Sequence, residues 1–123
     1  MKKHKYLLTA GCSFVYGSCM FLPDDPRNKK NPCKDYRFSK IMADGIGAEE
    51  INLAKAGGSN QRAFRRIYEW TRENPSKVKD TLLLLLDKKN FWMELIRMFG
   101  FTNFLTIENY QYQCLWVKMR GNI

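Results

Sequence analysis

The feature that most constrains the fold is the apolar run from Thr81 to Leu86, which contains five successive leucines and is bounded by Asp80 and Asp87. A strand with one face in water alternates apolar and polar residues, whereas a strand covered on both faces is apolar throughout. A membrane-spanning helix needs about 20 apolar residues, so this run is far too short to be one. The run therefore predicts a central strand of a parallel sheet.

Two shorter stretches before the leucine run also resemble strands. They cover residues 5–10 and residues 50–54, and each ends at small residues that are typical of a turn. Between them, helical spacing over residues 36–42 predicts a helix that ends at Gly45 and Gly47. The first two strands are therefore joined by a helix.

A second helix follows the second strand. Ser59 or Asn60 can cap its N-terminus, an apolar stripe runs from Ala63 to Thr71, and the Asn-Pro-Ser sequence at residues 74–76 ends it. The complete order is strand, helix, strand, helix, strand. This βαβαβ order predicts an α/β protein with right-handed crossovers.

The last third of the chain is less clearly patterned. Residues 91–98 suggest a helix and residues 110–118 a strand, but neither segment has clear boundaries. The leucine strand would lie on an exposed sheet edge unless residues 110–118 pair beside it, and an exposed apolar edge promotes aggregation. The large apolar residues of that segment do not share one alternating face. We therefore expect that residues 110–118 do not form a well-ordered strand beside the leucine run. The sheet would then be incomplete and the protein poorly soluble.

Length and charge limit what the protein can be. The chain has 123 residues, enough for a single small domain, and a formal net charge of +9. The basic residues are scattered, and the densest group, Arg62, Arg65 and Arg66, alternates with Glu69 and Glu73. Such alternation is typical of a solvated helix face. We expect weak attraction to polyanions but no specific nucleic-acid binding.

The cysteines and histidine exclude several classes of site. The four cysteines form no Cys-x-x-Cys pair and there is one histidine, so the usual zinc signatures are absent. Nothing else in the sequence implies a metal or an organic cofactor, and we expect neither. The apolar stretch at residues 5–10 is shorter than the roughly 7–15 residues of a secretory signal. We therefore expect a cytoplasmic protein with no membrane association. The cysteines are Cys12, Cys19, Cys33 and Cys114.

Two loops combine small residues with a hydroxyl group. Residues 11–14 (Gly-Cys-Ser-Phe) follow the first strand and open a turn-rich segment, residues 11–34, that is longer than an ordinary connection. Residues 56–60 (Ala-Gly-Gly-Ser-Asn) follow the second strand and open a helix, whose N-terminus favours an anion. Ligands of open α/β sheets bind at the carboxyl ends of the strands. We therefore expect the two loops to meet and form the site.

Both loops resemble conserved blocks of the SGNH (GDSL-type) hydrolases. Residues 8–17 (Leu-Thr-Ala-Gly-Cys-Ser-Phe-Val-Tyr-Gly) are similar to the first block in its Gly-Cys-Ser-Phe-x-x-Gly form, which is common among phage-encoded relatives. Residues 52–60 (Asn-Leu-Ala-Lys-Ala-Gly-Gly-Ser-Asn) are similar to the second block, Asn-x-Gly/Ala-x-x-Gly. The resemblance covers residues 1–86, whereas residues 87–123 diverge from the family.

The resemblance implies a fold and a chemistry. The fold would be a single flavodoxin-like, three-layer α/β/α domain with a short parallel sheet that is incomplete at the C-terminus. Ser13 would attack ester or acyl groups of a small-molecule or carbohydrate substrate, and the N–H groups of Ser13 and Gly57 would hold the oxyanion. A phage-encoded protein would act in the cytoplasm of the host. The remaining substrate-binding candidates are Gly11, Cys12, Phe14, Gly58, Ser59 and Asn60.

The C-terminal half of the family's catalytic machinery is absent. Asn90 is the nearest candidate for the third oxyanion donor, but the Gly-x-Asn pattern is missing and we expect it not to serve. The Asp-x-x-His block is also missing. His4 precedes the first strand and Ser13 follows it, which separates them by roughly 17 Å. A serine without a base is a poor nucleophile.

Three interpretations of this gap remain open. The chain is a truncated or frameshifted hydrolase with impaired catalysis, half of a split active site, or a non-catalytic flavodoxin-like module. Such a module would bind an anion, a carbohydrate or a protein partner without turnover. The sequence indicates no oligomeric state.

Overall fold

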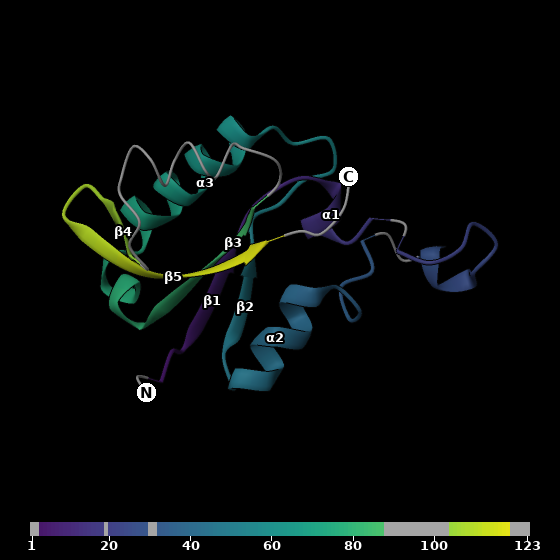
Figure 1. The fold of residues 1–123 in the computed structure, drawn as a ribbon, viewed down its shortest axis with the longest axis horizontal. Helices are drawn as coiled ribbons and strands as arrows, with labels where there is room; N and C mark the ends of the chain where they lie inside the picture. The colour runs from purple at the N-terminus through teal and green to yellow at the C-terminus, as the bar shows by residue number, and fades with distance from the viewer. Residues whose placement is uncertain (1–2, 19, 30–31, 88–103, 119–123) are drawn as a thin grey trace.

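The computed structural model describes residues 3–18, 20–29, 32–87 and 104–118. These residues contain a five-stranded sheet in the order β2-β1-β3-β5-β4 (Figure 1). The strands are β1 (Tyr6–Thr9), β2 (Glu49–Asn52), β3 (Thr81–Asp87), β4 (Phe104–Ile107) and β5 (Tyr110–Lys118). The helices are α1 (Ser13–Tyr16), α2 (Phe38–Ile46) and α3 (Asn60–Glu73), with 3-10 turns η1 (Pro26–Lys29) and η2 (Pro75–Asp80).

Four of the strands run parallel. β1 lies between β2 and β3, β5 pairs in parallel with the far side of β3, and β4 pairs antiparallel with β5 at the edge. The order β2-β1-β3 is the one with which flavodoxin-like sheets begin. The predicted α/β class is confirmed by this mostly parallel sheet and its helices.

The leucine run is central because both of its faces are covered. Leu84 packs with Leu7 in a cluster that includes Ala43 of α2. Leu83 and its alternate neighbour Leu85 pack in a second cluster, which includes residues of α3. All three leucines of β3 named here are at most 1% exposed. The run is continuously apolar because both faces of β3 are buried, as the sequence predicted.

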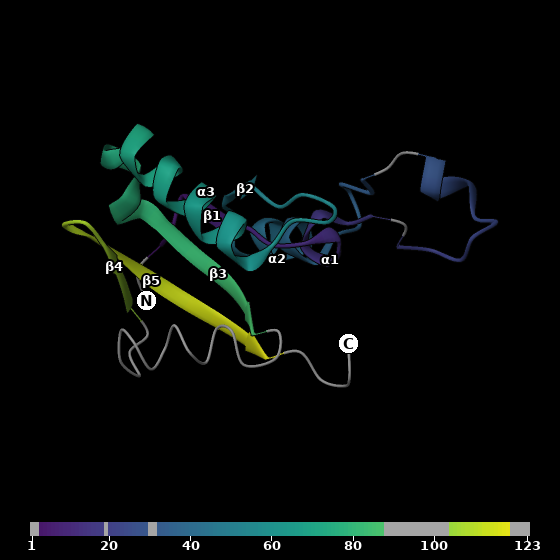
Figure 2. The same ribbon diagram turned by 90° about the horizontal axis from the view of Figure 1, so that it is seen from above.

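Residues 110–118 form a strand, β5, that pairs beside the leucine strand, and this corrects the expectation for that segment. β5 pairs with β3 from Leu82↔Gln113 to Asp87↔Lys118, so the leucine strand has a partner on each side. Figure 2 shows the β4–β5 hairpin on the side of β3 that faces away from β1. Tyr112 and Cys114 are buried, and Gln113 between them is exposed. Residues 111–114 therefore alternate between exposed and buried, as in a strand with one face against the core.

Smaller corrections concern element boundaries. β2 begins at Glu49 and ends at Asn52, so Leu53 and Ala54 already belong to the following loop. Gly45 lies inside α2, and Gly47 alone closes that helix, in the left-handed conformation with φ of 71°. The predicted helix at residues 91–98 lies outside the described residues.

Candidate functional site

The loops after β1 and β2 meet, as predicted. The backbone N–H of Leu53 donates to the carbonyl of Thr9 (2.8 Å), and that of Lys55 donates to the carbonyl of Gly11 (3.1 Å). A Cβ added to Gly58 would lie 2.9 Å from the Lys55 carbonyl oxygen and 3.2 Å from that of Gly11. The loops therefore approach as backbone against backbone, and a side chain at position 58 would separate them.

Ser13 is the first residue of α1, a four-residue helix that directly follows the carboxyl end of β1. Its side chain is exposed, and its carbonyl accepts hydrogen bonds from the N–H groups of Gly17 (3.0 Å) and Ser18 (3.1 Å). The sequence did not predict this helix, because one turn is too short for periodicity to reveal it. The helix presents Ser13 at the edge of the sheet where open α/β proteins bind ligands.

The other first-loop candidates surround Ser13. Cys12 is the extended residue before α1 and is half-buried, and Phe14 is the second residue of the helix. A Cβ on Gly11 would lie 2.6 Å from Cγ2 of Val15. Glycine at position 11 therefore allows α1 to fold back against the end of β1.

The second-loop candidates divide into a turn and a cap. Gly57 is exposed and left-handed, with φ of 74°, and the N–H of Gly58 donates to the carbonyl of Lys55 (2.9 Å). Ser59 caps α3, because its Oγ accepts from the N–H of Arg62 (3.1 Å). Of the two predicted caps Ser59 is therefore the one used, and Asn60 is the first residue of the helix.

The chain's single histidine is far from Ser13. His4 precedes β1 and lies next to Lys5, whose N–H donates to the Asp80 carbonyl at the amino end of the parallel strands. His4 is half-buried, and its Nδ1 is enclosed without a hydrogen bond to any described residue. Asn90, the doubtful oxyanion donor, lies outside the described residues.

Sequence reasoning missed a polar cluster beneath α1. It consists of Arg37, Ser39, Glu50 and Asn52, and the ion pair between Arg37 and Glu50 has both side chains only 9% exposed. Asn52 belongs to the second sequence block, which was the one available signal. Arg37 and Glu50 gave none, because charged residues are normally taken as solvated.

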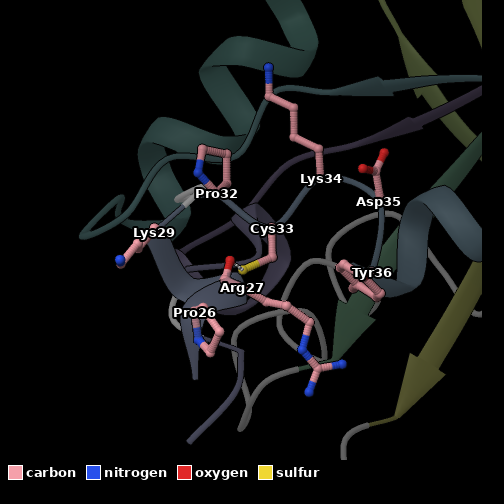
Figure 3. A pocket seen from close by; sticks show the side chains of 8 residues that line it. All are labelled: Pro26, Arg27, Lys29, Pro32, Cys33, Lys34, Asp35 and Tyr36. Carbon is pink, nitrogen blue, oxygen red and sulfur yellow. Dashed lines mark hydrogen bonds between the residues drawn. The ribbon is translucent and has the colours of Figure 1, made fainter. Parts of the chain in front are cut away.

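A surface pocket of about 780 Å³ lies in the long connection between α1 and α2 (Figure 3). The N–H of Cys33 donates to the Gly17 carbonyl (2.9 Å), which ties this pocket to the end of α1. The Arg27 guanidinium lies 3.7 Å from the ring centre of Phe21, and its hydrogen bonds lower the pKa of Asp25 to about 2. The pocket is lined by Pro26, Arg27, Lys29, Pro32, Cys33, Lys34, Asp35 and Tyr36.

The described ranges contain neither a metal-binding cluster nor a membrane-spanning helix. No group of three or more histidine, cysteine, aspartate or glutamate side chains is placed to hold a metal ion there. No helix in that part of the chain has the length and apolar character to cross a membrane.

No protein-family model matches the chain, and neither does any curated protein or any solved structure. The resemblance to SGNH hydrolases therefore depends on the two sequence blocks alone.

Proposed function

We propose that the chain is an SGNH-like serine hydrolase domain for ester or acyl bonds, with Ser13 as nucleophile and with impaired turnover. The observation that carries the proposal is the position of Ser13. It is exposed on a one-turn helix after β1, and its loop contacts the Gly57–Gly58 loop through the Gly11 carbonyl. This contact between the loops supports a single site built from both sequence blocks.

The chemistry follows from the groups at this site. The Ser13 oxygen would attack the substrate carbonyl, and the backbone N–H groups of Ser13 and Gly57 would stabilise the oxyanion. Backbone donors fixed before the reaction stabilise developing charge without reorganisation. The substrate class is an ester of a small molecule or carbohydrate, and the unpatterned cysteines favour action in the cytoplasm.

Turnover is expected to be slow because the sequence lacks the family's Asp-x-x-His block, which would supply the base for Ser13. Its one histidine, His4, lies at the opposite end of β1, so solvent hydroxide must take the serine proton. The Ser13-dependent rate should then rise steadily with pH. It should show no inflection near a pKa of about 6.5, the ordinary value for histidine.

Hydrolysis of short-chain p-nitrophenyl esters by the full chain tests this proposal. We expect a low rate above buffer that disappears in Ser13→Ala, while the variant keeps the wild-type melting temperature because the side chain is exposed. Hydrolysis that persists unchanged in Ser13→Ala would show that another group is responsible and would overturn the role of Ser13.

The alternative is a binding module without turnover. It is favoured by one observation, the pocket in the connection between α1 and α2, whose lining places Lys29 and Lys34 near the exposed ring of Tyr36. Such a pocket suits an anionic or carbohydrate ligand. Binding of an acetylated oligosaccharide that is equally tight in wild type and in Ser13→Ala, without hydrolysis in either, would support this alternative over the hydrolase.

A further inference from the structure

The short helix that carries Ser13 depends on the rest of the chain for its orientation. An isolated turn is unstable because nucleation fixes several residues for a single hydrogen bond. The last carbonyl groups of any helix also lack intrahelical partners. A four-residue helix such as α1 therefore needs external partners to hold one position.

Three successive carbonyl groups at the end of α1 have such partners. The Val15 carbonyl accepts from Nδ2 of Asn52 (2.9 Å), and the Tyr16 carbonyl accepts from Nη1 of Arg37 (3.2 Å). The Gly17 carbonyl accepts from the N–H of Cys33 (2.9 Å). One donor comes from β2 and two come from the connection that leads into α2, so two separate segments hold the helix.

Asn52 has a further contact that the other two donors lack. Its Oδ1 accepts from the N–H of Ala54 (3.0 Å), so one side chain binds both the Ser13 loop and the loop that leads to Gly57. The distance between the proposed nucleophile and the proposed oxyanion donor therefore depends on this amide. Asparagine suits the position because its side chain both donates and accepts.

The amide is itself held by the buried polar cluster. Asn52 Nδ2 also donates to Ser39 Oγ (3.0 Å), Ser39 donates to Glu50, and Glu50 receives two hydrogen bonds from Arg37 (2.9 and 2.7 Å). Fully satisfied polar networks of this kind restrict side chains to one arrangement. Arg37 acts twice, because it orients Glu50 and also binds the Tyr16 carbonyl.

We propose that Asn52 is a positioning residue for Ser13, with Arg37 in a supporting role. Asn52 fixes α1 through the Val15 carbonyl and fixes the Gly57 loop through Ala54, so it sets the geometry in which Ser13 reacts. This inference rests on the proposed function, since it requires Ser13 to be the nucleophile. It assigns a task to a side chain that touches neither the substrate nor the reacting atoms.

The test is the rate at which a fluorophosphonate probe modifies the full-length protein at alkaline pH. In that reaction the Ser13 oxygen bonds to phosphorus, fluoride leaves with the electron pair of the P–F bond, and hydroxide takes the serine proton. Asn52→Ala is compared with Thr71→Val, which removes a buried hydrogen bond to Tyr112 (2.6 Å) on the α3 side of the sheet. Thr71→Val is therefore a control for a general loss of stability.

We expect Asn52→Ala to slow modification of Ser13 about tenfold or more, because small misplacements of reacting groups carry large rate penalties. Thr71→Val should react at the wild-type rate. Equal rates for Asn52→Ala and wild type, or equal slowing in both variants, would overturn the inference. No modification of wild-type Ser13 would instead overturn the proposed function, and the inference with it.

A second variant keeps the inference testable if Asn52→Ala does not fold. Arg37→Lys retains a cation beside Glu50 but lacks the forked donor that reaches Glu50 and the Tyr16 carbonyl together. We expect this variant to react a few times more slowly than wild type, in the same direction as Asn52→Ala. A wild-type rate in folded Arg37→Lys would contradict the proposal that the network positions Ser13.

Discussion

Gly17 and Gly45 illustrate how differently single residues act in this fold. Gly17 is left-handed, with φ of 89°, and closes α1, and an added Cβ would lie 3.1 Å from Cβ of Arg37. Gly45 lies inside α2 with open space around it and no left-handed backbone. Glycine is therefore required at position 17 and is merely tolerated at position 45.

This contrast gives a paired prediction. Gly17→Ala should lower the free energy of unfolding by about 1–2 kcal/mol, the cost of a left-handed non-glycine residue. Gly45→Ala should raise it by about 0.5–1 kcal/mol, because alanine favours helix and restricts the unfolded chain. Urea denaturation of both variants measures the two changes. Changes of the same sign would show that Gly17 does not close α1 or that Gly45 does not lie inside α2.

At the scale of elements, the sequence was most informative where its pattern was longest. β3 and α3 were predicted because a continuous apolar run and an apolar stripe leave few alternatives. β5 was underestimated because Cys114 was not counted as apolar, although buried cysteine behaves as a small hydrophobic residue. With Cys114 included, Tyr112 and Cys114 alternate with exposed Gln111 and Gln113. α1 was missed because one turn has no period to detect.

The β4–β5 hairpin should be necessary for a soluble fold. Deletion of residues 100–123 removes the partner of β3 and the buried side chains of Ile107, Tyr112 and Cys114. The exposed leucine edge should then cause precipitation or loss of cooperative thermal unfolding. Gln113→Ala, an exposed change on the same strand, is the control and should remain soluble. A deletion with unchanged solubility and melting would show that β5 contributes nothing to the core.

The buried Tyr112, which is hydrogen-bonded to Thr71 of α3, should make the free energy of unfolding depend on pH in the alkaline range. Burial raises the pKa of Tyr112 to about 12, above the value of about 10 expected in the unfolded chain. A raised folded-state pKa stabilises the fold fully below pH 10, and that contribution is lost as the pH rises toward 12. Tyr112→Phe should therefore show a shallower decline in urea stability than wild type across this window. Parallel declines would indicate that the ring is not buried in solution.

Across the whole protein, the net charge and the meeting of the two loops were predictable from the sequence, whereas the polar network was not. The net charge of +9 still predicts weak binding to polyanions, but Arg66 pairs with Glu69 (2.7 Å) on the solvated face of α3 that the sequence indicated. The meeting of the two loops was predictable because parallel strands end at a common edge. The network of Asn52 and Arg37 was not predictable, because its residues come close together only in the folded protein.

Peptide mass spectrometry after fluorophosphonate treatment tests the proposal that Ser13 is the nucleophile of an SGNH-like site. We expect a slow, single adduct on the peptide that contains Ser13, formed faster at pH 9 than at pH 7 and absent from Ser13→Ala. An unmodified wild-type protein after prolonged treatment at pH 9, or an adduct that forms equally in Ser13→Ala, would contradict it.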